Sequence, residues 1–293
     1  MAEPAAIGVF SPGAMGAALG RAWQRGGARV VTTVAGRSAR TRALADGLEL
    51  LGGLGEVVDA AGAVILIGPP GEAPAMAAAL VAACRERGRR PLVAELNALA
   101  PAAVRRIGED FLALGCEFVD GAISGPPPRE GGHTRLYLSG AGAGRLAGLA
   151  APGVLARVVG AEVGAASAVK MSTASIYKGL VALLLHALYT ARANGVTELV
   201  LADLEAARLD RIVGEAGGRI AEAGSKAARF ADEMREIAAT QAAAGLTPLL
   251  FDAFAAVYEA VALTPLAELS PEQAAAVTDL GDALARLDAR GSA

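Results

Sequence analysis

The residues with the clearest chemistry lie near the N-terminus, where the turn 11–16 follows the short apolar run 6–10. An apolar run, a glycine-bearing turn and a helix of small residues form the layout of a dinucleotide-binding unit. Backbone N–H groups at the start of such a helix face a pyrophosphate, and the helix dipole favours its negative charge. We therefore predict that the phosphates of a dinucleotide contact Ser11, Pro12, Gly13, Ala14 and Met15.

This turn departs from the usual glycine pattern at its first position, which is Ser11. The first glycine serves the tight turn, so we expect Ser11 to adopt a backbone conformation that glycine reaches more easily. Gly13 and Gly16, which permit close approach of the backbone and packing of the helix, are present.

The residues after the second apolar run, 29–35, indicate which dinucleotide binds. An NAD site usually has an acid here to bind the ribose 2′-OH, but no Asp or Glu occurs between Gly16 and Asp46. The chain has two guanidinium groups and a hydroxyl instead, which suit a 2′-phosphate because the planar guanidinium pairs with phosphate oxygens. A basic surface loop is the alternative interpretation. The position favours an NADP site formed by Arg37, Ser38 and Arg40.

Length and composition limit the classes of protein. The 293 residues can form two domains, each with its own core. The net charge is −3 and both signs are interspersed, which does not suit a nucleic-acid surface. The longest apolar run, 179–188, is too short to span a bilayer. Cys84 and Cys116 lack metal-ligand spacing and are expected to be buried, reduced thiols. We predict a cytoplasmic protein that binds neither nucleic acid, membrane nor metal.

The order of the predicted elements indicates the fold. Strands are predicted at 63–67, 91–96, 117–121 and 134–139, and helices at 75–87 and 101–114. This alternation is typical of a doubly wound, mostly parallel sheet. A helical pattern begins at Ala165, and its first helix, 165–193, would be about 40 Å long. We predict an α/β Rossmann-type domain at 1–163 and an all-α domain at 164–293, joined by this long interdomain helix.

Three further stretches occur in an order that resembles one family. These are the loop 119–125, the helix start 164–170 and the loop 97–101. They resemble the substrate loop, the catalytic helix and the loop beneath the nicotinamide of the β-hydroxyacid dehydrogenases, which include 6-phosphogluconate and 3-hydroxyisobutyrate dehydrogenases. The later stretch 229–236 resembles a less studied C-terminal domain of 6-phosphogluconate dehydrogenase-like proteins. The resemblance implies a homodimer that oxidises or reduces a small hydroxy acid or related carbonyl compound with NADP.

The resemblance also assigns roles to individual residues. Lys170 matches the family's proton-transfer lysine, which acts as base in oxidation and as acid in reduction. Ser124 and Gly125 match the loop that binds the substrate carboxylate. The nicotinamide ribose would lie between Asn97 and the loop that begins with Gly68 and Pro69.

Four positions bear on the substrate side. Ala174 replaces the family's asparagine, and Pro126 has no N–H group where the family has a second glycine. Tyr177 lies on the same helical face as Lys170, so it could donate to a developing oxyanion or position the substrate; a half-buried structural tyrosine is the alternative. Lys178 is a candidate for binding a substrate carboxylate or phosphate.

Because the departures affect the substrate side only, we predict that hydride chemistry is kept and that the substrate has changed. Two alternatives stay open. One is an imine reductase, which the presence of Lys170 disfavours. The other is an NADPH-binding regulator that has lost turnover, which Ala174 and Pro126 favour.

Overall fold

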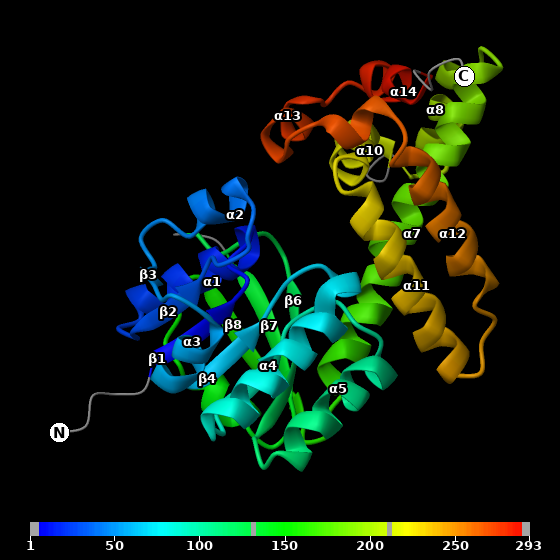
Figure 1. Ribbon diagram of the computed structural model, residues 1–293. Coiled ribbons are helices and arrows are strands. Elements are labelled where there is room, and N and C mark those ends of the chain that lie inside the picture. The colour runs from blue at the N-terminus through cyan, green and yellow to red at the C-terminus, as the bar shows by residue number, and fades with distance from the viewer. Residues whose placement is uncertain (1–5, 130–132, 210–212, 289–293) are drawn as a thin grey trace. The chain divides into compact units, whose positions relative to one another are not determined.

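The computed structural model describes residues 6–129, 133–209 and 213–288 (Figure 1). The chain divides into two compact units, Met1–Met171 and Ser172–Ala293, which we call the N-terminal and C-terminal units. The division lies inside the long helix α7 (Ala165–Ala193), later than the boundary predicted at 163/164. The first turns of α7 therefore belong to the N-terminal unit.

The N-terminal unit is built on an eight-stranded sheet in the order β3-β2-β1-β4-β5-β6-β7-β8. Neighbouring strands are parallel except for the antiparallel pair β6–β7. This order and direction confirm the predicted Rossmann-type fold. The strands are β1 (Ala6–Phe10), β2 (Val30–Thr33), β3 (Glu49–Leu50), β4 (Ala61–Leu66), β5 (Leu92–Glu95), β6 (Phe118–Ser124), β7 (Thr134–Ser139) and β8 (Val154–Gly160).

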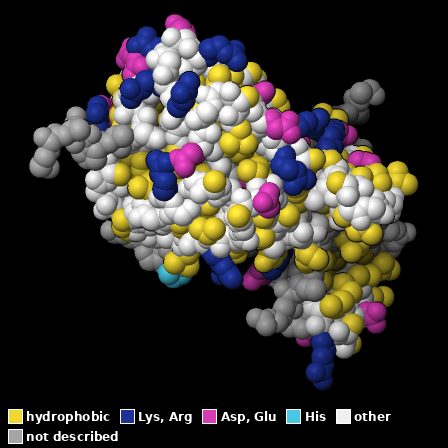
Figure 2. All heavy atoms as spheres, turned by 90° about the horizontal axis from the view of Figure 1, so that it is seen from below, with side chains coloured by type: hydrophobic (Ala, Val, Ile, Leu, Met, Phe, Trp, Pro, Cys, Tyr) yellow, Lys and Arg dark blue, Asp and Glu magenta, His cyan; other side chains and the backbone are white. Residues whose placement is uncertain are grey.

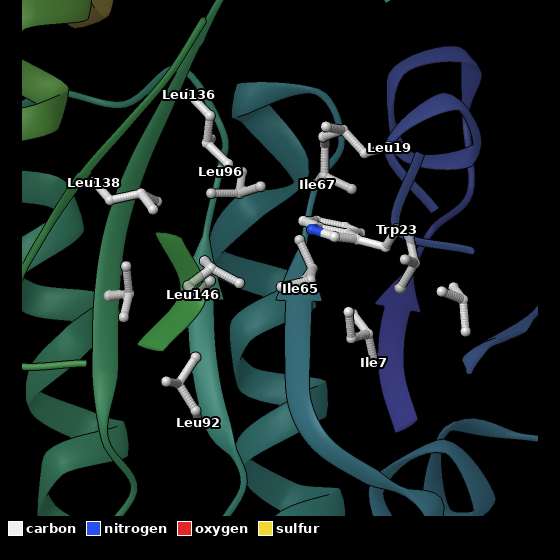
Figure 3. Close-up of a cluster of buried hydrophobic side chains, with 14 of the residues drawn as sticks. Ile7, Leu19, Trp23, Ile65, Ile67, Leu92, Leu96, Leu136, Leu138 and Leu146 are labelled. Atoms are coloured by element: carbon white, nitrogen blue, oxygen red, sulfur yellow. The ribbon is translucent and has the colours of Figure 1, made fainter. Parts of the chain in front are cut away.

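Helices cover both faces of this sheet because side chains alternate along its strands. Ile65 belongs to a buried cluster with residues of α1 and α6, whereas Val64 and Leu66 belong to a cluster with residues of α4 and α5. Figure 3 shows Trp23 of α1 lying beside Ile65 and Ile67 in the first cluster. The helices are α1 (Ala14–Arg25), α2 (Ala39–Leu44), α3 (Leu54–Ala60), η1 (Pro70–Glu72), α4 (Ala73–Arg87), α5 (Pro101–Ala113) and α6 (Ala143–Ala147).

The start of α7 is hydrogen-bonded to the side chain of Asp120, a fully buried residue of β6. Its Oδ2 accepts hydrogen bonds from the N–H groups of Gly164 (2.9 Å) and Ser167 (3.0 Å) and from the hydroxyl of Ser139 (2.9 Å). Its Oδ1 accepts from the hydroxyl of Ser167 (2.6 Å). A carboxylate at a helix N-terminus satisfies free N–H groups and matches the helix dipole. These bonds explain why the first turns of α7 pack with the sheet.

The described part of the C-terminal unit is helical, as predicted. Tyr258, a fully buried side chain, packs edge-to-face on Phe230 with 5.5 Å between ring centroids, and its hydroxyl donates to the carbonyl oxygen of Lys178 (2.7 Å). These contacts join α7, α11 and α12. The elements after α7 are α8 (Thr197–Ala206), α10 (Ala216–Gly224), α11 (Ala227–Ala243), α12 (Leu249–Val261), η2 (Pro265–Glu268), α13 (Pro271–Ala276) and α14 (Leu280–Asp288).

Among the described residues, one helix, α7, is long and apolar enough to cross a membrane by length and composition. The core helix of a folded domain meets the same criterion, and 44% of the most apolar stretch of α7 is buried inside the protein. The absence of a membrane-spanning segment therefore stays a prediction. On the face shown in Figure 2, basic and acidic side chains are interspersed with hydrophobic ones.

We expect Asp120→Asn to lower the free energy of unfolding by about 3 kcal/mol, because the amide leaves buried donors without an acceptor. Urea denaturation would measure the loss. Asp110→Asn, at an exposed position of α5 in the same unit, is the matched control and should change the value by less than about 0.5 kcal/mol. Equal effects of the two substitutions would contradict the role given to Asp120.

Candidate dinucleotide and substrate site

The turn after β1 contains a residue with a left-handed backbone conformation. Ser11 is buried and has φ +72°, in the left-handed region that glycine favours, as predicted. The N–H group of Gly13 donates to the carbonyl oxygen of Ser11 (2.8 Å), which closes the turn before α1 begins at Ala14.

Two glycines of this turn have different surroundings: Gly16 packs closely against the sheet, and Gly13 faces open space. A Cβ atom at Gly16 would lie 2.9 Å from Cγ2 of Ile67 and 3.0 Å from the carbonyl oxygen of Ser11, so only glycine permits this packing. A Cβ atom at Gly13 would meet no atom within 4 Å. No side chain caps α1 and its first turn has no acidic residue. The open helix N-terminus therefore fits an anionic group such as a pyrophosphate.

Basic groups lie after β2, the neighbour of β1 in the sheet. The Arg37 guanidinium lies over the ring of Phe10, 5.3 Å from its centroid, and its Nη1 is 3.8 Å from Oε2 of Glu72. The hydroxyl of Ser38 accepts from the N–H group of Thr41 (3.2 Å) and thereby caps α2. Arg40 is exposed. Two guanidinium groups thus follow the strand that determines nucleotide preference in this fold.

The loops after β4 and β5 are bonded to each other through Asn97. Its Oδ1 accepts from the N–H group of Gly68, and its own N–H group donates to Oε1 of Glu95 (2.7 Å). Asn97 is buried, and its Nδ2 has no hydrogen-bond partner in the described structure. Pro69 continues the Gly68 loop into η1.

Glu95, the last residue of β5, is buried and pairs in register with Asp120 of β6. Burial raises the pKa of the Glu95 carboxyl to about 8; the Asn97 N–H group opposes this rise and the nearby Asp120 adds to it. With this raised pKa, Glu95 holds its proton at neutral pH.

Lys170 reaches the end of β6 from the first turns of α7. Its side chain is half-buried, and Nζ donates to the carbonyl oxygen of Ile123 (2.8 Å). Ser124 is the last residue of β6. The next residue, Gly125, is exposed and has φ +110°. The structure therefore brings the predicted proton-transfer lysine to the predicted substrate loop.

All of these residues lie in the N-terminal unit, at or beyond the carboxyl ends of its parallel strands. The carboxyl ends of parallel strands meet at one edge of a sheet, which is where open α/β sheets bind ligands. The arrangement combines an uncapped helix N-terminus, basic groups, a buried amide and the amino group of Lys170.

Lys178 and Tyr177, the two predicted site residues in the C-terminal unit, have surroundings that differ from those expected. Lys178 forms an ion pair with the buried carboxylate of Glu233, lies 4.0 Å from the centroid of the Phe230 ring and is only 12% exposed. Its charge is compensated inside the unit, so its assignment to substrate binding is corrected. Tyr177 is 65% exposed, so it is not the half-buried tyrosine of the alternative interpretation.

Comparison with known proteins agrees with this architecture. Residues 191–261 match the domain of unknown function DUF1932. A conserved protein of unknown function, whose structure was described as similar to 3-hydroxyacid dehydrogenases, has 27% identity and a TM-score of 0.65 over 87% of this chain and 96% of its own. The 3-hydroxyisobutyrate dehydrogenase of Mycobacterium tuberculosis has 18% identity and a TM-score of 0.68 over 97% of this chain and 99% of its own. The chain therefore has the fold of the 3-hydroxyacid dehydrogenases.

The same fold also occurs in a reductive aminase from Aspergillus terreus, solved with NADPH, at 18% identity and a TM-score of 0.55 over 96% of this chain and 98% of the other. No curated protein matches the chain in sequence. Within the described ranges, no three His, Cys, Asp or Glu side chains are grouped as metal ligands. As predicted, Cys84 and Cys116 are free and buried, and burial raises the pKa of Cys84 to about 12.

The roles of the two buried acids, Asp120 and Glu95, were not predicted from the sequence. Asp120 lies within the stretch 119–125 and Glu95 near the end of the predicted strand 91–96, but the sequence did not mark either as a site residue. An acidic residue inside or near the end of an otherwise apolar strand is the feature of the sequence that could have indicated them. Such a residue must be bonded or uncharged when buried.

Glu95 predicts a dependence of stability on pH. Its pKa is about 8 in the folded protein and near the ordinary 4.5 in the unfolded chain. Between these values the folded state keeps a proton that the unfolded chain has lost, so the contribution of Glu95 to stability is fully present below the lower value and is lost as pH rises. The free energy of unfolding should fall by up to about 1.4 kcal/mol per pH unit relative to Glu95→Gln.

Urea denaturation of both proteins between about pH 5 and about pH 8 would measure this difference. Taking the difference cancels the titration of groups common to both. A difference that does not change with pH would show that Glu95 is ionised in the folded protein.

Proposed function

We propose that this protein is an NADP-dependent oxidoreductase that transfers a hydride between nicotinamide and a small hydroxy acid or a related carbonyl compound. One observation carries the proposal: the anion-binding turn at Ser11–Gly16 and the half-buried Lys170 lie at the same edge of one parallel sheet. A proton-transfer group next to a dinucleotide site is what hydride transfer to a carbonyl needs, because the oxygen gains a proton as the carbon gains a hydride.

The cofactor proposal is supported by the residues around the turn. The N-terminus of α1 accepts the pyrophosphate, and Arg37 and Arg40 pair with a 2′-phosphate, beside the hydroxyl of Ser38. Because Arg37 already lies over Phe10, its guanidinium loses little freedom on binding. The fold neighbour from Aspergillus terreus was solved with NADPH, which agrees with this choice over NAD.

The chain's own residues supply the proton and hold the substrate. A bound nicotinamide supplies the hydride in reduction and accepts it in oxidation. Lys170 donates a proton from Nζ to the carbonyl oxygen in reduction and removes it from the hydroxyl in oxidation; its bond to the Ile123 carbonyl holds the ammonium group at the end of β6. Ser124 and Gly125 bind the substrate carboxylate through a hydroxyl and an N–H group. Tyr177 is a further donor, and its exposed hydroxyl is available for a ligand.

The substrate differs from that of the family's hydroxyacid enzymes in this proposal. Ala174, which is buried, offers no side-chain hydrogen bond, and Pro126 offers no N–H group to an anion. A second candidate, imine reduction, is favoured by Ala174 and by a fold shared with an imine reductase from Aspergillus terreus at 20% identity, with a TM-score of 0.54. Lys170 favours the first candidate.

We also propose that the protein is a cytoplasmic homodimer. The exposed face of α7 in the C-terminal unit has large apolar side chains that water does not favour, among them Ile176 (69% exposed) and Leu183 (58% exposed). Such exposure is typical of an interface. The free, buried thiols agree with a reducing compartment.

We predict that the double substitution Arg37→Ala with Arg40→Ala raises the dissociation constant of NADPH at least about tenfold and leaves that of NADH unchanged, because only NADPH has the 2′-phosphate. Titration of cofactor fluorescence would measure both constants. Arg85→Ala, an exposed arginine on α4, is the control. Equal weakening of both cofactors would contradict the proposed NADP preference.

We predict that Lys170→Met lowers turnover at least about 100-fold while NADPH binding stays within about threefold, because the substitution removes the proton-transfer group and keeps the apolar stem. Oxidation of NADPH would be followed with a panel of short aldehyde-acids and, separately, with cyclic imines. Lys226→Met on the C-terminal unit is the matched control. Unchanged turnover in Lys170→Met would make the catalytic assignment wrong, and activity with imines alone would favour the second candidate.

A further inference from the structure

Two exposed arginines lie on the last two strands of the sheet, Arg135 on β7 and Arg157 on β8. Neither guanidinium has an acidic partner or a hydrogen bond within the part of the chain that the structure describes. Arginine is the side chain best suited to bind a carboxylate or a phosphate, because its planar group donates two parallel hydrogen bonds. A guanidinium without a partner next to a substrate loop is therefore a candidate for binding an anionic ligand.

Arg135 lies beside Ser124, the last residue of β6. The two residues are paired in register between the antiparallel strands β6 and β7, as are Asp120 and Ser139. Side chains that are directly opposite in such a pair point to the same face of the sheet, with about 5 Å between their Cβ atoms. Every second residue of a strand shares a face, so Arg135 and Ser124 lie on the face of Asp120 and Ser139.

This face of the sheet is the one on which α7 begins. The hydroxyl of Ser139 accepts a hydrogen bond from the N–H group of Ala166 (3.1 Å), in the first turn of α7. Lys170 lies one turn later, and its Nζ donates to the carbonyl oxygen of the residue before Ser124 (2.8 Å). Arg135 and the proposed proton-transfer group thus lie on the same face, both at the end of β6.

The loop after β6 is held against the start of β7. The hydroxyl of Thr134 donates to the carbonyl oxygen of Pro126 (2.6 Å). A Cβ atom at Gly125 would lie 3.3 Å from the carbonyl oxygen of His133. These contacts bring the predicted substrate loop next to Arg135. Pro126 has no N–H group to offer to an anion, whereas a guanidinium can bind both oxygens of a carboxylate.

We infer that Arg135 binds the carboxylate of the substrate, together with Ser124 and Gly125, and replaces the N–H group that Pro126 lacks. The substrate is then a carboxylic acid whose reacting carbonyl or hydroxyl lies within a few bonds of the carboxylate, because Arg135 and Lys170 both lie at the end of β6. This inference rests on the proposed function, since it requires that the reaction takes place at Lys170. It selects a carboxylated substrate over an uncharged carbonyl compound or imine.

The test compares aldehyde-acids with their methyl esters, which lack the negative charge. Oxidation of NADPH would be followed with malonic semialdehyde and succinic semialdehyde and with the methyl ester of each. Arg135→Gln removes the charge and keeps a polar side chain, and Arg135→Lys keeps the charge without the planar group. Arg157→Gln is the matched control, because Arg157 is exposed on the same face but is paired in register with Tyr137, one strand further from Ser124.

We expect Arg135→Gln to lower kcat/KM for the acids at least about tenfold, chiefly through a higher KM, and to change it by less than about twofold for the esters. Arg135→Lys should retain part of the activity with the acids. Arg157→Gln should have wild-type kinetics, and all three variants should bind NADPH within about twofold of the wild type. Both arginines are exposed, so the substitutions should leave the fold intact.

Three results would overturn the inference and leave the proposed function standing: wild-type kinetics with the acids in Arg135→Gln, an equal loss for acids and esters, or an equal loss in Arg157→Gln. A change of oligomeric state in Arg135→Gln, seen by size-exclusion chromatography, would also overturn it and assign the arginine to a subunit contact. Wild-type activity with esters or cyclic imines but not with acids would contradict it and favour imine reduction. If the wild-type protein oxidises NADPH with none of these compounds, the proposed function fails, and the inference fails with it.

Discussion

The structure depends on the buried carboxylate of Asp120. It accepts four hydrogen bonds, from the hydroxyl of Ser139 on β7, from the N–H group of Gly164 and from both the N–H group and the hydroxyl of Ser167 in α7. A buried carboxylate is costly unless it is bonded in this way, and free N–H groups at a helix N-terminus are costly unless an acceptor meets them. The hydrogen bonds between Asp120 and the start of α7 satisfy both the carboxylate and the N–H groups, and they form only if α7 begins next to Asp120.

The position of α7 determines the position of the ammonium group. Lys170 lies three residues after Ser167, so a helix whose first N–H groups donate to Asp120 brings Nζ to the carbonyl oxygen of Ile123 at the end of β6. The same strand direction brings the turn after β1 and the loops after β4 and β5 to this edge. Glu95, beside Asp120 in the sheet, stays neutral because burial raises its pKa to about 8. One carboxylate thereby links the fold to the proposed chemistry.

The sequence was sufficient for the fold class, the long helix 165–193 and the strained turn at Ser11, because these follow from apolar periodicity and glycine placement. Short or exposed elements such as β3 and β8 were missed because their side chains give little periodic signal. Lys178 was assigned to substrate because sequence cannot reveal its partner Glu233, which is distant along the chain. The roles of Asp120 and Glu95 also come from contacts between strands and helices distant in sequence.

We propose that one edge of the sheet binds the dinucleotide and carries Lys170. Amide hydrogen exchange with and without NADPH tests it most directly, because a ligand slows the opening of the segments it contacts. We expect slower exchange at 11–16, 36–41 and 97–99 and in the first turns of α7. Slower exchange confined to α10–α14, or no change in any segment, would contradict it.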